Sequence, residues 1–447
     1  MIIHPPRGPQ WASWLLVAIW ISFIYYTIIK ASDIRNTIDK ELGTKVEEAI
    51  YKVKGGGTEA QKKSDQYSKK VVIYLVLLIA FSGIISAFVM IIRNWERYGW
   101  LSILALIALL YLYFNTVWDI YDSKKHSRWE SMHFVQYGVL SILVFRAFAH
   151  SLRDSGIYLA VLFFTALVGA VDETVQWITP GRYWDFDDLP LNAYSSLLAL
   201  MVVGLGLRPA YLKLRVGAVS MRTIAICGTA FLIYLGGCCS NTAAWLPFWQ
   251  KTFPTVAEQE DPMAEYGYLH VDPEFGAFKS RLTLEEIKAA DAARAEEAAT
   301  LMPEKSRMLD LALYNVFLGE YNSVRDPWLH ELRVHLYSRD KNEQRVREQI
   351  EAPKPDYGEK VAKMLKEEQI LWKYYPQFMA AYNLFPDRQF QAELRPNMDT
   401  APYVSAVSQG LITKVSLGQI WSVIIALILV LFGLSFWRRK REDEAIA

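Results

Sequence analysis

Eight apolar runs dominate the pattern of hydrophobic and polar positions along the chain. A helix needs roughly 17–25 residues to cross about 30 Å of hydrocarbon. The runs that meet or approach this length cover residues 11–30, 71–92, 99–118, 132–149, 156–172, 190–207, 222–239 and 418–437. The sequence therefore predicts an all-α fold, a polytopic membrane bundle of about eight spans. The first run is expected to stay as an anchor, because it lacks a small-residue cleavage site.

Two polar stretches between these runs predict further helices. Residues 34–53 carry apolar side chains at helical spacing and end before three glycines, which predicts an amphipathic helix on the bundle or membrane surface. Residues 240–416 form a separate domain, in which the capping box Thr283-Leu-Glu-Glu286 starts a helix that ends near residue 301. Further helical patterns cover residues 306–320, 326–337, 341–351, 357–382 and 386–393. Residues 266–276 read as an ordered loop.

These elements divide the chain into five predicted parts. They are an N-terminal membrane anchor (1–30), an amphipathic helical loop (31–70), a membrane bundle (71–239), an extracytoplasmic helical domain (240–416), and a C-terminal membrane helix with a basic tail (417–447).

Lys and Arg in short loops predict the orientation of the bundle. The tail Arg438-Arg-Lys-Arg441 is a strong cytoplasmic signal, and Arg208, Lys213, Arg215 and Arg222 flank the connection between the sixth and seventh runs. With eight spans, both signals lie inside a bacterial inner membrane, both termini are cytoplasmic, and residues 240–416 lie outside. The Lys-rich loop 31–70 disagrees with this topology, because it would then lie outside as well.

Composition agrees with a membrane bundle that carries a sizeable polar domain. The chain is 52% hydrophobic and 21% charged, with a net charge of +1. That balance argues against nucleic acid as a partner, since neutralising phosphates requires a basic excess. The three cysteines, Cys227, Cys238 and Cys239, have no CxxC spacing, so neither a structural metal nor a cofactor is predicted.

Polar residues cluster at the ends of three of the predicted spans. Residues three and four apart share one face of a helix, so each span end presents a polar stripe. The stripes and the connecting turn contain Glu130, His133, Tyr137, Asp172, Glu173, Gln176, Arg182, Asp188 and Asn192. With the predicted topology all three stripes lie at the same membrane depth, and the Pro180-Gly181 turn lets Arg182 fold back toward the carboxylates.

Two interpretations of this cluster are about equally supported. In the first, it is a buried polar network in which Arg182 neutralises carboxylates between helices. In the second, it is a pocket for an anionic headgroup at the outer leaflet, with Arg182 and His133 as recognition groups, since a guanidinium binds phosphate bidentately. A catalytic site with Glu130, His133 and Glu173 as acid–base groups is less favoured, because no nucleophile or metal set completes it. No catalytic residue is assigned.

The cluster resembles the signature of the VanZ-like family of membrane proteins. The resemblance rests on His133-Phe134 with Tyr137, then Asp172-Glu173 with Gln176, then Pro180-Gly181-Arg182, then Asp188 and Asn192, within about residues 119–207. One position departs from the family, which commonly has Gly where this chain has Ser195. The family is named for a bacterial protein that lowers sensitivity to teicoplanin. The resemblance implies an envelope protein that touches lipid-linked cell-wall precursors.

The segment His330-Glu331-Leu-Arg-Val-His335 differs from the zinc motif HExxH, although its residue types are similar. Its two histidines stand five apart, about 140° round a helix, so they do not share a metal. Glu331 and His335 stand four apart and are expected to form a surface pair.

Three functions follow from these features. The leading hypothesis is a non-enzymatic envelope protein that binds a membrane lipid or lipid-linked ligand, with a link to glycopeptide resistance. The second is a structural subunit that binds a protein partner through residues 240–416. The third is a membrane enzyme acting on lipid or glycan.

Overall fold

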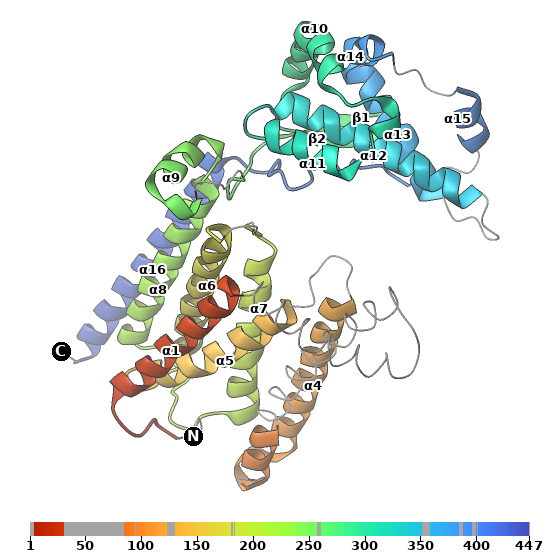
Figure 1. Ribbon diagram of the computed structural model, residues 1–447. Helices are drawn as coiled ribbons and strands as arrows, with labels where there is room; N and C mark the ends of the chain where they lie inside the picture. Colours follow the sequence, from red (N-terminus) through yellow and green to blue (C-terminus); the bar gives the residue numbers. More distant parts are fainter. Residues whose placement is uncertain are drawn as a thin grey trace. The chain divides into compact units, whose positions relative to one another are not determined.

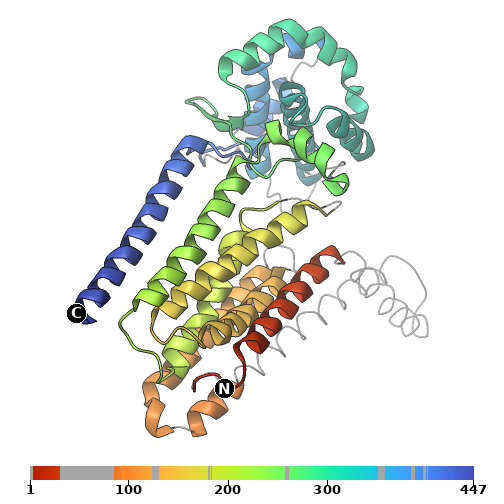
Figure 2. The ribbon, with the colours of Figure 1, turned by 90° about the vertical axis from the view of Figure 1, so that its left-hand side faces the viewer.

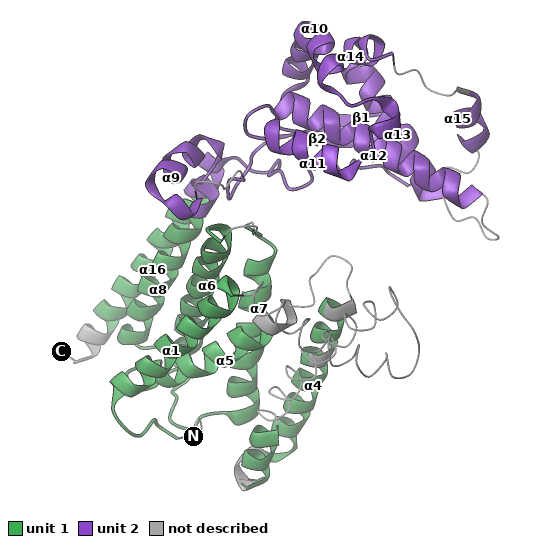
Figure 3. Ribbon diagram, in the orientation of Figure 1, with its two compact units in different colours: residues 1–237, 422–447 green, residues 238–421 purple. Residues whose placement is uncertain are grey.

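The fold is mostly helical and consists of two compact units. The computed structural model describes residues 4–30, 85–93, 95–122, 130–179, 182, 184–256, 261–350, 358–383, 388–395, 399 and 401–446. Unit 1 comprises Met1–Gly237 and Ser422–Ala447, and unit 2 comprises Cys238–Trp421 (Figure 3). The predicted amphipathic helix at 34–53 lies outside the described residues.

Unit 1 is built from apolar helices (Figure 1). They are α1 (Gln10–Ile29), α4 (Trp95–Asp122), α5 (Glu130–Phe148), α6 (Gly156–Trp177), α7 (Asp188–Met201) with a π-helix (Val202–Leu207) directly after it, α8 (Ala218–Ser240) and α16 (Leu417–Ile446). Within the described residues, six segments are long and apolar enough to cross a membrane: Gln10–Ile29, Gly99–Ile120, Gly156–Trp177, Asp188–Leu207, Ala218–Ser240 and Leu417–Arg441. They correspond to six of the eight predicted runs.

The two remaining runs are described only in part. The fourth run forms α5, whose apolar portion, Phe134–Phe148, is shorter than a full span. Only the last residues of the run at 71–92 are described, and they are helical. The structure therefore supports a membrane protein of several spans, and the predicted number of eight is not confirmed.

Helix α5 packs against α1, α6 and α7 and organises the core of unit 1. Leu140, Val144 and Phe145 of α5 are fully buried. Trp14 of α1 meets Phe148 edge-on, with ring centroids 5.2 Å apart. Helix α16, in contrast, keeps most of its apolar side chains exposed, as expected of a helix that faces hydrocarbon. It runs alongside α8 in both views (Figures 1 and 2).

Two loops pair at the end of unit 1 where α6 begins. The backbone N–H of Ser155 donates to the carbonyl of Lys213 at 2.8 Å, and the N–H of Lys213 donates to the carbonyl of Arg153 at 2.9 Å. The Asp154 carboxylate accepts hydrogen bonds from Gly156 N, Gly217 N and Ser220 Oγ, at 2.9, 3.1 and 2.8 Å. These bonds tie the α5–α6 hairpin to the start of α8.

Unit 2 is mainly helical and contains one β-hairpin. Its elements are α9 (Leu246–Thr252), β1 (Tyr268–Asp272), β2 (Gly276–Ser280), α10 (Leu284–Leu301), α11 (Leu311–Glu320), α12 (Pro327–Ile350), α13 (Gly358–Tyr374), α14 (Pro376–Ala381) and α15 (Arg388–Leu394), with short 3-10 turns at Ala243–Trp245, Pro254–Val256 and Lys305–Arg307. Helices α12 and α13 pack along each other, and α10 packs on α14. Asp291 of α10 accepts from Gln377 N and Phe378 N at 2.9 and 3.0 Å, while burial raises the pKa of its carboxyl group.

Local signals account for the helix boundaries in unit 2. The predicted capping box is confirmed, since the Thr283 side chain accepts from Glu286 N and the Glu286 carboxylate accepts from Thr283 N. The predicted helix at 357–382 divides into α13 and α14 at Pro376, because proline has no N–H to continue the hydrogen-bond ladder. The helices predicted at 326–337 and 341–351 form one continuous helix, α12.

Two interpretations of unit 2 were wrong. Residues 268–280 form an antiparallel hairpin, with Tyr268 opposite Ser280 and Asp272 opposite Gly276, where a loop was expected over 266–276. Glu331 and His335 are buried and face different partners, where a surface pair was expected. Glu331 binds Arg281, and His335 Nδ1 lies 2.6 Å from Glu367 Oε2. Arg281 directly follows β2 and Glu367 lies in α13, so the buried charges are compensated by partners from other elements.

Candidate functional site

The last two turns of α6 carry three buried polar side chains. Asp172, Glu173 and Gln176 are at most 3% exposed. They lie within five positions of one another, so the helical repeat brings them to one side of α6. Polar side chains enclosed in an apolar bundle are costly unless other polar groups surround them. The end of α6 is therefore the centre of the candidate site.

Helices α5 and α7 each bring one polar side chain to this centre. Tyr137 of α5 is fully buried and Asn192 of α7 is 2% exposed. Gly169 of α6 lies between them, because a Cβ at Gly169 would stand 3.4 Å from the Asn192 Cβ and 3.6 Å from the Tyr137 ring. Gly169 therefore marks the place where the three helices pack against one another, at ordinary van der Waals distances.

A chain of hydrogen bonds connects the buried centre to Arg182. Gln176 Nε2 donates to Glu173 Oε1 at 2.7 Å, and Arg182 Nη2 donates to Gln176 Oε1. The Gln176 amide thus orients the guanidinium through its oxygen, while its nitrogen is bound to the buried Glu173 carboxylate. Arg182 itself is half-buried. We call this Glu173–Gln176–Arg182 chain the relay.

The charges around the relay interact with one another. Arg182 and Asp188 both act electrostatically on Asp172 and on Glu173, and Asp185 also acts on Glu173. Arg182 attracts the two buried carboxylates, whereas Asp185 and Asp188 add negative charge at the half-buried rim. The structure therefore brings together Tyr137, Asp172, Glu173, Gln176, Arg182, Asp188 and Asn192. The side chains of Glu130 and His133, and residues Pro180 and Gly181, lie outside the described part.

Ser195, where the family commonly has glycine, holds α7 against α5. Its hydroxyl donates to the carbonyl oxygen of Phe134, and the side chain is buried. A Cβ at Gly138 of α5 would lie 3.5 Å from Ser195 Oγ. The serine therefore keeps the close approach that glycine would allow and adds a hydrogen bond between the helices.

Helix α1 contributes residues that the sequence pattern did not reveal. Trp20 Nε1 donates to the Gln136 carbonyl at 2.9 Å, and Gln136 Nε2 donates to Thr27 Oγ1 at 3.0 Å. Tyr25 donates through its hydroxyl to the Val168 carbonyl at 3.3 Å. The sequence assigned α1 only as an anchor, although Tyr25-Tyr26-Thr27 is a polar run at the end of an apolar one. That polar run is the feature of the sequence from which the contacts of α1 with other helices could have been predicted.

The described residues contain no group of three or more His, Cys, Asp or Glu side chains that could hold a metal ion. The relay instead offers one oriented guanidinium beside carboxylate acceptors. Such a set can bind an anion through Arg182 and accept hydrogen bonds through Asp188.

Comparison with known proteins relates part of the helical core to a known family. The VanZ/LLP1 family model matches residues 14–206, somewhat under half of the chain. No curated protein and no solved structure matches the chain. The matched range begins within α1 and includes Trp20 and Tyr25, the residues of α1 that donate hydrogen bonds to α5 and α6. Residues 14–206 are therefore similar to the VanZ-like family, and the match together with the apolar helices supports a membrane protein.

Proposed function

We propose that the chain binds an anionic, lipid-linked ligand of the bacterial envelope, with Arg182 as its contact group. The observation that carries this proposal is the relay: a half-buried guanidinium is aimed by Gln176 while Glu173 stays enclosed. A planar guanidinium held in one orientation suits the paired oxygens of a phosphate.

The acidic rim narrows the chemistry of the proposed ligand. Asp185 and Asp188 would repel a headgroup that carries only negative charge, but they accept hydrogen bonds from hydroxyl or amino groups. A phosphate attached to a sugar supplies both kinds of group. We therefore favour a lipid-linked glycan precursor over a simple phospholipid at this site, and the link to glycopeptide resistance is part of the same proposal.

The proposed orientation puts this site at the outer leaflet of the inner membrane, with both termini in the cytoplasm. Basic side chains from two loops and from α16 support it. They line one cavity of about 450 Å³ that includes Arg153, Lys213, Arg215, Arg438 and Arg441. Basic residues gather on the cytoplasmic side of membrane proteins, and Asp172 lies at the opposite end of α6 from that cavity. Residues 240–416 would then be extracytoplasmic.

Replacing Arg182 with alanine should release the ligand. Native mass spectrometry of the full-length protein from bacterial membranes should show a retained lipid-linked adduct that is lost in Arg182→Ala. A charge-assisted hydrogen bond contributes about 1.5–3 kcal/mol, so retention should fall on the order of tenfold to a hundredfold.

Arg222→Ala is the matched control, because Arg222 is an exposed arginine near the start of α8, at the other end of the bundle. It should retain the adduct. Equal adduct in Arg182→Ala and the unsubstituted protein, or none in either, would refute the proposal.

A scaffold role is the second candidate, and one observation favours it. Unit 2 exposes apolar side chains on β1 and α11, with Val271 75% and Val316 67% exposed. A contiguous exposed apolar patch marks a protein contact, and Tyr268, Leu269 and Val271 are exposed together on β1. Cross-linking in native membranes would support this role by trapping one stoichiometric partner on residues 268–320, and would count against it if no partner were trapped.

A further inference from the structure

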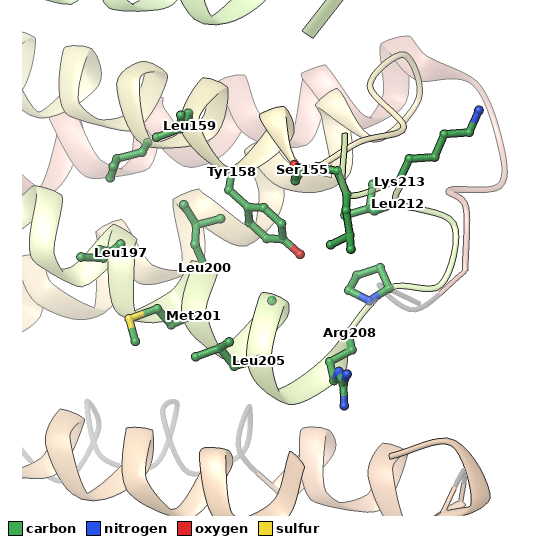
Figure 4. A pocket seen from close by; sticks show the side chains of 14 residues that line it. Ser155, Tyr158, Leu159, Leu197, Leu200, Met201, Leu205, Arg208, Leu212 and Lys213 are labelled. Carbon is green, nitrogen blue, oxygen red and sulfur yellow. Dashed lines mark hydrogen bonds between the residues drawn. The ribbon is translucent and has the colours of Figure 1, made fainter. Parts of the chain in front are cut away.

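A groove runs along unit 1 between the first half of α6 and the far end of α7. Its volume is about 450 Å³. Leu159 and Leu162 line it from α6, and Leu197, Leu200 and Met201 line it from α7 (Figure 4). The wall continues through Leu205 of the π-helix. This part of the groove therefore matches the chemistry of a hydrocarbon chain.

Polar groups gather at the other end of the same groove. Figure 4 shows the Tyr158 hydroxyl pointing toward that end, where Ser155, Arg208 and Lys213 lie. Arg208 and Lys213 are both exposed. The groove thus passes from an apolar floor to a cationic mouth, the order of groups found in an anionic lipid.

The length of the groove corresponds to one leaflet. From Leu197 to Arg208 is eleven residues, which at about 1.5 Å each gives at most roughly 16 Å along the helix axis, because the π-helical residues 202–207 rise less per residue. Half of a hydrocarbon core of about 30 Å is roughly 15 Å. A chain lying in the groove would therefore end near the middle of the bilayer when its headgroup is at the mouth.

The π-helix shapes the groove. Gly204 lies in it, and a Cβ at this position would stand 3.4 Å from the Tyr158 ring, so the phenol packs directly against this turn. Arg208 follows the π-helix in a left-handed conformation, with φ of 43°, and its N–H donates to the Val203 carbonyl at 2.9 Å. Single π-helical turns inside α-helices are frequent at functional sites.

A second cavity, the basic cavity described above, adjoins the mouth. Lys213 lines both cavities. The basic cavity contains five Lys and Arg side chains and one acidic residue, Asp154. The Asp154 carboxylate already accepts hydrogen bonds from Gly156 N, Gly217 N and Ser220 Oγ. Its net charge is positive, so a negatively charged headgroup at the mouth is attracted from both sides.

We propose that this groove is a binding site for an anionic phospholipid, with one acyl chain along α6 and α7 and the phosphate at the cationic mouth near Arg208 and Lys213. The site is distinct from the relay. Ser155 and Asp172 are seventeen residues apart, or roughly 26 Å along α6. The proposal does not depend on what the relay binds.

Photo-cross-linking of the full-length protein tests the proposal. The protein is placed in phosphatidylcholine vesicles that contain a trace of phosphatidylglycerol with a diazirine on its acyl chain. The probe should label peptides within 156–162 and 197–214, several-fold more than the same probe with a phosphatidylcholine headgroup. The double variant Arg208→Gln/Lys213→Gln should label on the order of tenfold less, while Arg222→Gln should label normally.

Filling the groove provides an independent test if the double variant fails to fold. Leu205 is 52% exposed, so Leu205→Trp can project its ring into the groove and should exclude the chain. Ile226→Trp is its control, since Ile226 is 53% exposed on α8 and does not line the groove. Equal labelling by the two headgroups, unchanged labelling in Leu205→Trp, or loss of labelling with soluble glycerol phosphate would overturn the proposal.

Discussion

Replacing Glu331 with alanine should lower the free energy of unfolding of unit 2 by roughly 3 kcal/mol or more. Glu331 is the shared acceptor of several buried or half-buried donors, and each such donor costs about 1–3 kcal/mol when it is left unpaired. Arg281 itself keeps its ion pair with Glu265. Glu331 is 1% exposed. Its Oε1 accepts from Arg281 N, Arg281 Nη1 and Ser408 Oγ at 2.9, 3.1 and 3.1 Å, and its other oxygen accepts from Ser280 Oγ. The carboxylate thereby joins α12 to β2 and to the segment near Ser408. Hydrogen exchange of residues 268–350 in the full-length protein measures the change.

Glu343→Ala is the matched control on the same helix. Glu343 pairs with Arg347 at 2.7 Å, but both side chains are exposed, at 36% and 50%. Exposed pairs of this kind contribute roughly 0.3–0.5 kcal/mol. If the two substitutions had equal effects, Glu331 would not be the buried link described here.

Substituting alanine for Gly276 should destabilise unit 2 by about 3 kcal/mol or more, since it adds a steric overlap to backbone strain. Gly276 has a φ of 109°, a conformation that side chains disfavour, and a Cβ there would overlap the carbonyl oxygen of Tyr403. That carbonyl accepts from Ala277 N at 2.9 Å, so a shift to relieve the overlap would break the contact between β2 and residues 403–405. Trypsin digestion of the full-length protein should cut unit 2 much faster.

Gly319→Ala separates steric effects from the general cost of changing a glycine. Gly319 lies in α11, and no atom comes within 4 Å of a Cβ built there. The substitution should leave the digestion rate unchanged or lower it, because alanine favours helix. Similar digestion rates for the two variants would contradict the assigned role of Gly276.

The membrane helices could be predicted from the sequence because a long apolar run is a signal that needs no partner. Six of the eight runs recur as helices long and apolar enough to span. The hairpin was missed because its strands have only five residues each, and because the apolar residues do not mark the buried face: Leu269 and Val271 are exposed, whereas Asp272 and Ser280 are buried. The turn between them, Asp272-Pro-Glu-Phe-Gly276, carried the available signal, since glycine commonly closes a three-residue hairpin loop.

For the candidate site, the sequence could predict only contacts between residues of the same helix. The three-residue spacing that put Glu173 and Gln176 on one face is local, and these side chains do meet. The contact between Gln176 and Arg182, in contrast, depends on the path of the chain after the end of α6. The partners of Glu331 and His335 depend on packing between distant segments: Arg281 is fifty positions away and Glu367 thirty-two. Helical spacing carries no information on such pairs.

Unit 2 is inserted between α8 and α16, and this connectivity has a consequence for proteolysis. Its first and last residues adjoin apolar helices of unit 1, and the Trp421 indole donates to Ser240 Oγ at 2.9 Å, so the two connections lie together. A single cut anywhere inside the unit leaves each fragment attached to its own apolar helix. Release of a soluble product requires two cuts, so a single cleavage does not shed this unit.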